Sequence, residues 1–279
     1  MSDVTIPTVD LGPYLWYGQF DRDARHESLA VAAALETLGV VNVRDPRMPE
    51  GLDESFLNLT QRYFEQAAEA KQADERFSLG HQIGWTPPYT EKPRDRAAML
   101  DELIASYAMH TADYPATYTW YRLKGGRSKD AKERFFERVG PRPEKTNYPG
   151  LNEPTLVPAA FPEWLEVTTA WSSHMLAALM TTLEMAAVGF GVEPNFFTRL
   201  MQFAPHLLAP TGSDLMTHTE LGTPFAGFHS DLNLATIHGR SNYPGLFAWT
   251  RDWRRFPVRV PQGAFLVQSG MQLERLTGG

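Results

Sequence analysis

The sequence predicts an α+β fold in which a mainly helical part, residues 1–204, supports an antiparallel sandwich or jelly roll formed by residues 205–279. In the first part, apolar residues recur every three to four positions, which is typical of helices. After Pro205, the apolar runs become short and alternate with glycine and proline, which is typical of closely spaced antiparallel strands. The composition, 43% apolar over 279 residues, supports one full core, so we expect a single domain over residues 1–279.

The helical part begins with a segment over residues 22–38 that ends before Gly39, a residue that favours a helix C-terminus. A short strand is expected at residues 40–43. Aromatic and aliphatic residues at spacings of three and four predict a second helix over residues 53–73. Large apolar side chains every four positions make residues 164–188 the clearest helix, and we expect this stripe to lie in the core.

Many prolines and glycines interrupt residues 80–162, so we expect long loops there, with short helices near residues 94–107 and 129–138. Beyond Pro205, short runs of apolar residues predict five strands. These expected strands are residues 225–229, 232–238, 246–250, 256–260 and 264–268.

The composition excludes several classes of partner and site. A net charge of −7 gives the chain no general attraction for nucleic acid or anionic membranes, so a small molecule is the expected partner. The absence of cysteine excludes disulfides, iron–sulfur clusters and thiolate zinc sites, so any metal site must use His, Asp and Glu. Neither a signal peptide nor a membrane-spanning segment is indicated, and a cytoplasmic location is expected.

The strand-rich part contains the pair His229 and Asp231, separated by one residue. Side chains two positions apart on a strand point to the same face, so an imidazole and a carboxylate can share one metal ion. The pattern alone is weak, because most such pairs are solvated or hydrogen-bonded structural residues. His218 and Glu220 provide the same ligand types, but they lie in a segment rich in glycine and proline that is expected to be a loop.

The order of motifs around His229 and Asp231 is more specific than the pair itself. The motifs are Gly227-Phe228-His229-Ser230-Asp231, Leu234-Ala235-Thr236-Ile237, Pro244-Gly245-Leu246, Gly263-Ala264-Phe265-Leu266-Val267-Gln268-Ser269-Gly270 and Leu273-Glu274-Arg275-Leu276-Thr277-Gly278-Gly279, preceded near the N-terminus by Ile6-Pro7-Thr8-Val9-Asp10-Leu11 and Leu35-Glu36-Thr37-Leu38-Gly39-Val40-Val41. This ordered set resembles the isopenicillin N synthase-like branch of the iron(II)/2-oxoglutarate oxygenases.

The resemblance implies a distorted jelly roll (double-stranded β-helix) that holds Fe(II) through His, Asp and a distal His and leaves positions for 2-oxoglutarate and O2. The first two ligands correspond to His229 and Asp231. The distal His and the anchor for the 2-oxoglutarate carboxylate follow the Thr-x-Gly turn in this family, whereas the given sequence stops at Gly279, within that turn. We therefore expect the last strands to lie in a tail that was not included.

The wall of the pocket is expected to continue to Thr236, His238 and Arg240, with Leu246 added by the resemblance and Gln268 as a weaker candidate. A guanidinium that points into a pocket needs an anion, so Arg240 is a candidate partner for a substrate or cosubstrate carboxylate. The alternatives are that Arg240 is a solvated loop residue, that His238 is a hydrogen-bonded core histidine, and that Thr236 and Leu246 only pack.

These observations predict a non-haem iron(II) oxygenase that couples decarboxylation of 2-oxoglutarate to hydroxylation, desaturation or cyclisation of a small organic substrate. An isopenicillin N synthase-like oxidase that uses O2 without 2-oxoglutarate is the alternative within the class. Should the chain truly end at Gly279, the alternative from another class is a noncatalytic jelly-roll module that binds a small ligand or a partner chain.

Overall fold

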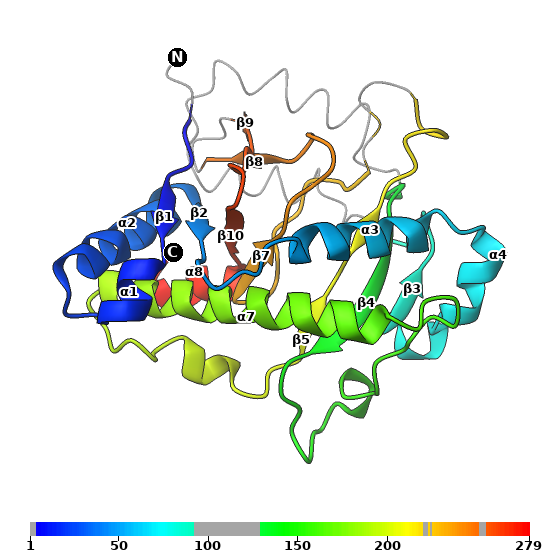
Figure 1. Cartoon of the computed structure of the whole chain (residues 1–279), viewed down its shortest axis with the longest axis horizontal. Coiled ribbons are helices and arrows are strands. Elements are labelled where there is room, and N and C mark those ends of the chain that lie inside the picture. Colours follow the sequence, from blue (N-terminus) through cyan, green and yellow to red (C-terminus); the bar gives the residue numbers. More distant parts are fainter. Residues whose placement is uncertain (1–3, 92–128, 220–222, 224, 251–254) are drawn as a thin grey trace. The chain divides into compact units, whose positions relative to one another are not determined.

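A computed structural model describes residues 4–91, 129–219, 223, 225–250 and 255–279 (Figure 1). The chain forms two compact units built from alternating segments. Unit 1 contains Met1–Asp53, Ala170–Ala204 and Ser230–Gly279, and unit 2 contains Glu54–Thr169 and Pro205–His229. Two helices, α3 (Leu52–Phe64) and α7 (Trp164–Gly189), contribute residues to both units.

Unit 1 is organised around a four-stranded sheet with the order β1-β2-β10-β7 (Figure 1). Its strands are β1 (Thr8–Asp10), β2 (Val40–Arg44), β10 (Phe265–Ser269) and β7 (Ala235–His238). Strand β1 runs parallel to β2, whereas β10 runs antiparallel to both β2 and β7. A separate antiparallel hairpin joins β8 (Phe247–Trp249) and β9 (Arg255–Pro257).

The helices of unit 1 begin and end at residues with clear local causes. Helix α1 (Gly12–Tyr17) precedes α2 (Arg22–Leu38), whose first turn is capped by the Asp21 carboxylate through the N–H groups of Asp23 and Ala24. Helix α2 ends at Gly39, which adopts a left-handed conformation with φ of 70°. Helix α8 (Met271–Thr277) follows β10 after Gly270.

The unit 1 sheet contributes to an apolar cluster. Ile6, Val40, Phe256 and Leu266 are buried together there. Buried residues from the second half of α7, including Leu183, add to the apolar interior of this unit. Burial of such side chains stabilises a fold by about 1.5 to 3 kcal/mol each, so this cluster is a principal source of stability for the sheet.

Unit 2 contains a second antiparallel sheet centred on β4 (Glu133–Val139). Strand β3 (Gly84–Thr86) pairs with β4, and β5 (His206–Leu208) and β6 (Thr211–Gly212) pair with it as well. The remaining short helices of the two units are α4 (Ala68–Lys71), η1 (Gln72–Asp74), η2 (Phe77–Leu79), η3 (Pro149–Leu151) and η4 (Thr198–Met201).

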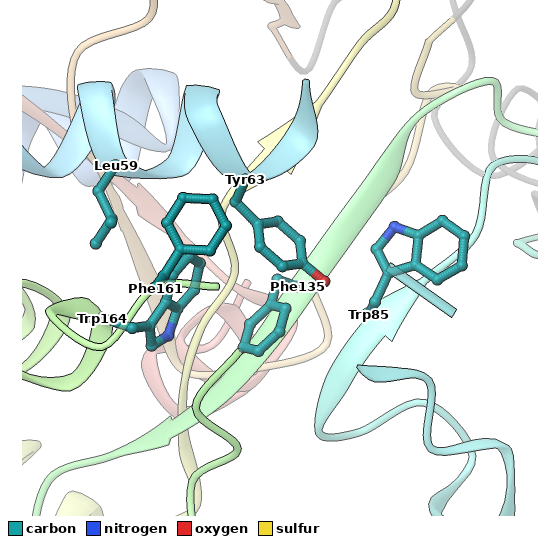
Figure 2. Close-up of a cluster of buried hydrophobic side chains, with 6 residues drawn as sticks. All are labelled: Leu59, Tyr63, Trp85, Phe135, Phe161 and Trp164. Carbon is teal, nitrogen blue, oxygen red and sulfur yellow. The ribbon is translucent and has the colours of Figure 1, made fainter. Parts of the chain in front are cut away.

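The core of unit 2 is aromatic. Figure 2 shows its six buried side chains, with the rings of Tyr63, Phe135, Phe161 and Trp164 gathered below α3 and Trp85 on β3. The Tyr63 ring lies edge-on to Phe135 with centroids 5.1 Å apart, and the Phe135 and Trp164 centroids are 4.8 Å apart. The first pair is edge-to-face and the second is tilted, and aromatic pairs of this kind add about 0.5 to 1.5 kcal/mol to the burial of the rings.

A carboxyl group is buried beside these rings. Glu137 on β4 is 2% exposed and accepts hydrogen bonds from Trp164 Nε1 and Thr168 Oγ1, both at 3.0 Å. Burial penalises its charged form more than the two hydrogen bonds stabilise it, and this raises the pKa of Glu137 to about 7. The interior of unit 2 therefore contains a group that titrates near neutral pH.

The mixed helical and antiparallel fold class predicted from the sequence is confirmed. The expected helices over residues 22–38 and 164–188 correspond to α2 and α7. The helix expected over residues 53–73 is divided, because Gln66 Nε2 and Lys71 Nζ donate to the carbonyl oxygens of Tyr63 and Phe64 and end α3.

Two expected elements are wrong. Residues 129–138 do not form a helix, since this segment contains β4, whose buried charged side chains gave no alternating hydrophobic pattern. Residues 225–229 do not form a strand, although strands are present within 232–238, 246–250, 256–260 and 264–268 or one residue beyond them. The short helix expected near residues 94–107 lies outside the described residues. None of the described helices has the length and apolar character required to cross a membrane.

Candidate metal site

His229 lies in irregular backbone at the end of unit 2 and is exposed. Its Nδ1 atom is 2.8 Å from the carbonyl oxygen of Gly227. A carbonyl oxygen only accepts hydrogen bonds, so this contact requires the proton on Nδ1 and leaves the ring lone pair on Nε2. This is the tautomer in which an imidazole binds a metal through Nε2.

Two contacts to residues just before β4 hold the segment that leads to His229. The backbone N–H of Lys132 donates to the Phe225 carbonyl oxygen at 3.2 Å. The backbone N–H of Gly227 donates to the Asp130 carboxylate at 2.9 Å. One of these two acceptors is thus a side-chain carboxylate, and the described residues 225–229 form no strand.

Asp231 belongs to unit 1 and is held by a different set of contacts. Its Oδ2 atom accepts a hydrogen bond from the Thr236 hydroxyl, and Thr236 Oγ1 in turn accepts from Asn233 Nδ2 at 2.9 Å. The Asp231 carbonyl oxygen accepts from the N–H of Met271 at 2.9 Å. The carboxylate is therefore oriented by a neighbouring hydroxyl while its backbone is fixed to the start of α8.

Gly270 makes this attachment possible. A Cβ atom at this position would lie 2.1 Å from the carbonyl oxygen of Asn233, which is far inside van der Waals contact. The Gly270 N–H donates to the Leu234 carbonyl oxygen at 2.9 Å. A larger residue at position 270 would therefore push away the backbone that carries Asp231.

Strand register groups three of the five predicted pocket residues. Thr236 lies opposite Gln268, and His238 lies opposite Leu266, on the paired strands β7 and β10. Directly paired residues point to the same face, so Thr236, His238 and Gln268 share one face of the sheet. If side chains alternated strictly from Asp231 onward, residues 235 and 237 would share its face. Residues 233–234 form a bend, so the alternation between the two faces does not continue through them from Asp231 into β7.

The other two predicted pocket residues lie outside the strands. Arg240 is half-exposed, and its Nε atom is 3.9 Å from Asp53 Oδ2, so a carboxylate of the protein itself lies close to the guanidinium. Asp53 also accepts from Trp171 Nε1 at 3.0 Å. Leu246 is exposed just before β8, and its carbonyl oxygen accepts from the N–H of Val258. The assignment of all five residues to a pocket stays a prediction.

His218 and Glu220, the other pair with the same types of ligand, are only partly within the described residues. Glu220 lies outside the described residues. His218 Nε2 is 2.9 Å from the Tyr89 hydroxyl, and the His218 ring packs edge-on against Phe225 with centroids 5.8 Å apart. The structure therefore gives His218 an aromatic and hydrogen-bonding environment.

The donor types fit a divalent iron ion in part. A neutral imidazole nitrogen and a carboxylate oxygen are donors that Fe(II) accepts, and one residue, Ser230, separates His229 from Asp231. Within the part of the chain that the structure describes, His, Asp and Glu side chains form no group of three or more suited to a metal ion. The described residues thus offer two candidate ligands and leave the third unassigned.

Sequence reasoning missed the supporting residues Asp130, Asn233 and Met271. Asn233 follows Asp231 by two positions, and a polar residue so close to a candidate ligand was a usable signal. The sequence contains no such signal for Asp130, because Asp130 and Gly227 are 97 positions apart. The structure is needed to find contacts of this kind.

Comparisons with known proteins place these residues in context. No family model matches the chain. The curated protein validamycin A dioxygenase of Streptomyces hygroscopicus subsp. limoneus is 29% identical over 126 residues, which cover 44% of this chain and 34% of that protein. The match thus spans about a third of that relative's length.

Solved structures match over nearly the whole chain. A full-length Neurospora crassa protein in complex with alpha-KG and thymine has a TM-score of 0.71 and 16% identity, covering 98% of this chain and 76% of that one. A 2OG-Fe(II) oxygenase family protein from Caulobacter crescentus has a TM-score of 0.70 and 19% identity, with coverage of 98% and 76%. JOX2 in complex with 2OG, Fe and JA has a TM-score of 0.65 and 16% identity, with coverage of 98% and 67%.

Proposed function

Since the chain has the fold of the 2-oxoglutarate/Fe(II) oxygenases, we propose that it is an iron(II)- and 2-oxoglutarate-dependent dioxygenase of a small organic substrate. The predicted resemblance to this family is confirmed at the level of the fold by structures that cover 98% of the chain. We include in the proposal that residues 1–279 act as one oxygenase domain with a distorted jelly roll.

The observation that carries this proposal is the fold likeness to proteins crystallised with the cosubstrate. The Neurospora crassa protein was solved with alpha-KG, and JOX2 with 2OG and Fe. The independent sequence match to a dioxygenase supports the same class. The His-x-Asp pair supplies donor types that such chemistry needs.

His229 and Asp231 are the proposed protein ligands of Fe(II). The contact of Nδ1 with the Gly227 carbonyl oxygen leaves Nε2 as the nitrogen of His229 that would bind the metal ion, and the Thr236 hydroxyl orients the Asp231 carboxylate, which would supply an oxygen ligand. When bound, Fe(II) and 2-oxoglutarate would supply the oxidising chemistry from O2. Neutral imidazole and ionised carboxylate are both required, so the site should load metal poorly at acidic pH.

The substrate side of the site is proposed from the sheet face described above. Thr236, His238 and Gln268 share that face, and Arg240 and Leu246 follow it along the chain. We propose that this wall holds the substrate or cosubstrate, and that a carboxylate of either would share the Arg240 guanidinium with Asp53. The proteins compared act on or bind small molecules, namely validamycin A, thymine and JA. Hydroxylation, desaturation and cyclisation are all compatible with this class of substrate.

Anaerobic titration tests the proposal. Fe(II) followed by 2-oxoglutarate should produce a weak visible charge-transfer band, and subsequent O2 should be consumed with release of succinate and CO2. His229→Ala should abolish the band, whereas Asp214→Ala, which changes an exposed carboxylate outside the site, should retain it. A protein that binds Fe(II) and consumes O2 but leaves 2-oxoglutarate intact would instead be an isopenicillin N synthase-like oxidase. Absence of both the band and O2 uptake contradicts the enzymatic function.

A further inference from the structure

We propose that Asp130 is a positioning residue for His229, acting through the backbone of Gly227. This inference rests on the proposed function, because it concerns how a proposed metal ligand is held. Asp130 lies in unit 2, as do Gly227 and His229, so every contact in the chain of support belongs to one compact unit.

Asp130 is a buried and fully engaged residue. It is 7% exposed, although an unpaired buried carboxylate would be costly. Its Oδ2 atom accepts from Lys132 Nζ at 2.6 Å, and its Oδ1 atom accepts from the Gly227 N–H at 2.9 Å. Its backbone N–H donates to the Glu91 carbonyl oxygen, and its carbonyl oxygen accepts from the Tyr89 N–H. Contacts through both its backbone and its side chain therefore fix the position of this carboxylate.

The charge on Asp130 is balanced by a local ion-pair network. Lys132 Nζ lies 2.8 Å from Glu91 Oε2 as well as 2.6 Å from Asp130. Arg134 in turn pairs with Glu91. Since both Lys132 and Arg134 keep Glu91 as a partner, removing the Asp130 carboxylate leaves neither cation without an anion.

The contact of Asp130 with Gly227 restrains the backbone two residues before His229. Glycine has more accessible backbone conformations than any other residue, so a segment that passes through Gly227 toward His229 needs an external restraint. Asp130 fixes the N–H of Gly227, and Lys132 fixes Phe225 two residues earlier. With its N–H held, Gly227 presents its carbonyl oxygen to His229 Nδ1 at 2.8 Å.

The consequence is a defined tautomer and ring orientation at His229. Outer partners that orient a ligating histidine typically change metal affinity by about 10- to 100-fold when they are removed. Asp130 does not contact His229 itself. It holds the backbone of Gly227, whose carbonyl oxygen accepts the hydrogen bond from His229 Nδ1. Loss of Asp130 should therefore shift the imidazole toward the Nε2–H tautomer, which cannot bind metal through Nε2 without losing that proton.

The first measurement needs no metal. Long-range ¹H–¹⁵N spectra of the full chain with labelled histidine, recorded near pH 8, report the protonation and tautomer of each ring. His229→Gln identifies the His229 signals among the eight histidines. In the unmodified protein, His229 should be in the Nδ1–H form. Asp130→Ala should increase the Nε2–H form, and an unchanged tautomer in this variant would overturn the proposal.

A matched control separates positioning from general loss of stability. Asp45 in unit 1 is 9% exposed, accepts the Arg47 N–H at 2.9 Å and pairs with the Arg47 guanidinium, so it repeats the chemistry of Asp130 elsewhere in the chain. Asp45→Ala should lower the melting temperature but leave the His229 tautomer and the Fe(II) dissociation constant unchanged. Equal weakening of Fe(II) binding by both alanine variants would overturn the positioning role.

The Fe(II) titration adds a functional readout. Asp130→Ala should raise the dissociation constant by roughly 10- to 100-fold, and Asp130→Asn, whose amide oxygen can still accept from Gly227, should restore most of the affinity. A tautomer shift in Asp130→Ala combined with no Fe(II) binding by the unmodified protein would support the positioning role and contradict the proposed function. If Asp130→Ala does not fold, hydrogen exchange of the Gly227 amide in the unmodified protein decides. Protection of about 100-fold or more is expected, and unprotected exchange would overturn the proposal.

Discussion

The two proposed metal ligands differ in what orients them. His229 is oriented by a backbone carbonyl, that of Gly227, in a segment held by the distant residue Asp130. Asp231 is oriented by a side-chain hydroxyl, that of Thr236, only five positions along the chain. The side chain of the histidine is therefore oriented through a long-range contact within unit 2, whereas the side chain of the aspartate is oriented by a residue close to it in sequence, and only its backbone uses a distant partner, the first residue of α8.

This difference predicts different sensitivities. A local support such as Thr236 can be removed with little effect on the rest of the fold, because its partners are near in sequence. A long-range support is lost when unit 2 loosens, because the contact depends on the position of Asp130, just before β4. The core of unit 2 adds a further sensitivity to pH through the buried carboxyl group of Glu137.

Removal of the aspartate ligand is the change with the largest expected effect. Asp231→Ala deletes an anionic donor, so Fe(II) affinity should fall by more than the roughly 100-fold upper range for outer partners. The fold should persist because Asp231 is only partly buried. Anaerobic Fe(II) titration and thermal melting measure the two effects separately.

Asp214 provides the control for this change. Its carboxylate also accepts a threonine hydroxyl, from Thr217 at 2.6 Å, but it is exposed and separate from the candidate ligands. Asp214→Ala should leave Fe(II) affinity unchanged. If the two alanine variants bind iron equally well, Asp231 is not a ligand.

Removal of the hydroxyl that orients Asp231 should have an intermediate effect. Thr236→Val keeps the side-chain shape but deletes the donor, so the Fe(II) dissociation constant should rise by roughly 10-fold or somewhat more. Thr236→Ser should restore affinity, because serine retains the hydroxyl. Titration of both variants tests this prediction, and Thr217→Val, which removes the equivalent donor to Asp214, serves as the control. Unaltered iron affinity in Thr236→Val would show that the hydroxyl does not support the ligand.

The smallest effect is expected from the buried carboxyl group of unit 2. Burial raises the pKa of Glu137 from 4.5 to about 7. Between these two pH values, the Glu137 carboxyl group is protonated in the folded protein but ionised in the unfolded chain. Stability from this group is present at pH 4.5 and is lost as the pH rises toward 7. Glu137→Gln should remove this loss and stabilise the protein at pH 8 by about 1 to 2 kcal/mol.

Melting temperatures of Glu137→Gln and of the unmodified protein, measured between pH 5 and pH 8, test the direction of this pH dependence. The increase in melting temperature caused by the substitution should be larger at pH 8 than at pH 5. Glu163→Gln changes a more exposed carboxyl group, paired with Arg62, and should show no such widening with pH. An equal gain from Glu137→Gln at both pH values would contradict titration of Glu137 in this range.

The elements that the sequence predicted well have their causes within a few residues. Helix α2 begins after the capping side chain of Asp21 and ends at Gly39, and both signals are local. The strands after Pro205 are delimited by glycine and proline in the same way. The pair His229 and Asp231 was selected from spacing and motif order, and its role as a pair of metal ligands stays a prediction.

Strand β4 could not be recognised because its interior does not follow the usual hydrophobic pattern. Phe135 points into the core, but Glu137 and Arg138 are also buried, at 2% and 3% exposure. Both side chains have hydrogen-bond partners far away in the sequence, Trp164 for Glu137 and the carbonyl oxygen of His206 for Arg138. A pattern based on polarity therefore assigned these residues to the surface of a helix.

The sheet of unit 1 also has a consequence for the order in which the protein forms during synthesis. Strand β10 lies between β2 and β7, and the bond from the Ser269 hydroxyl to the Gly39 carbonyl oxygen spans 230 residues. At about 5 to 20 residues per second, the ribosome needs more than about 10 seconds to supply β10 after β2 has emerged. Until then the valines of β2 have no β10 to pair with, so the nascent chain has an apolar segment that a chaperone can bind. The backbone that carries Asp231 bonds to the start of α8, so this attachment too waits until β10 has been made.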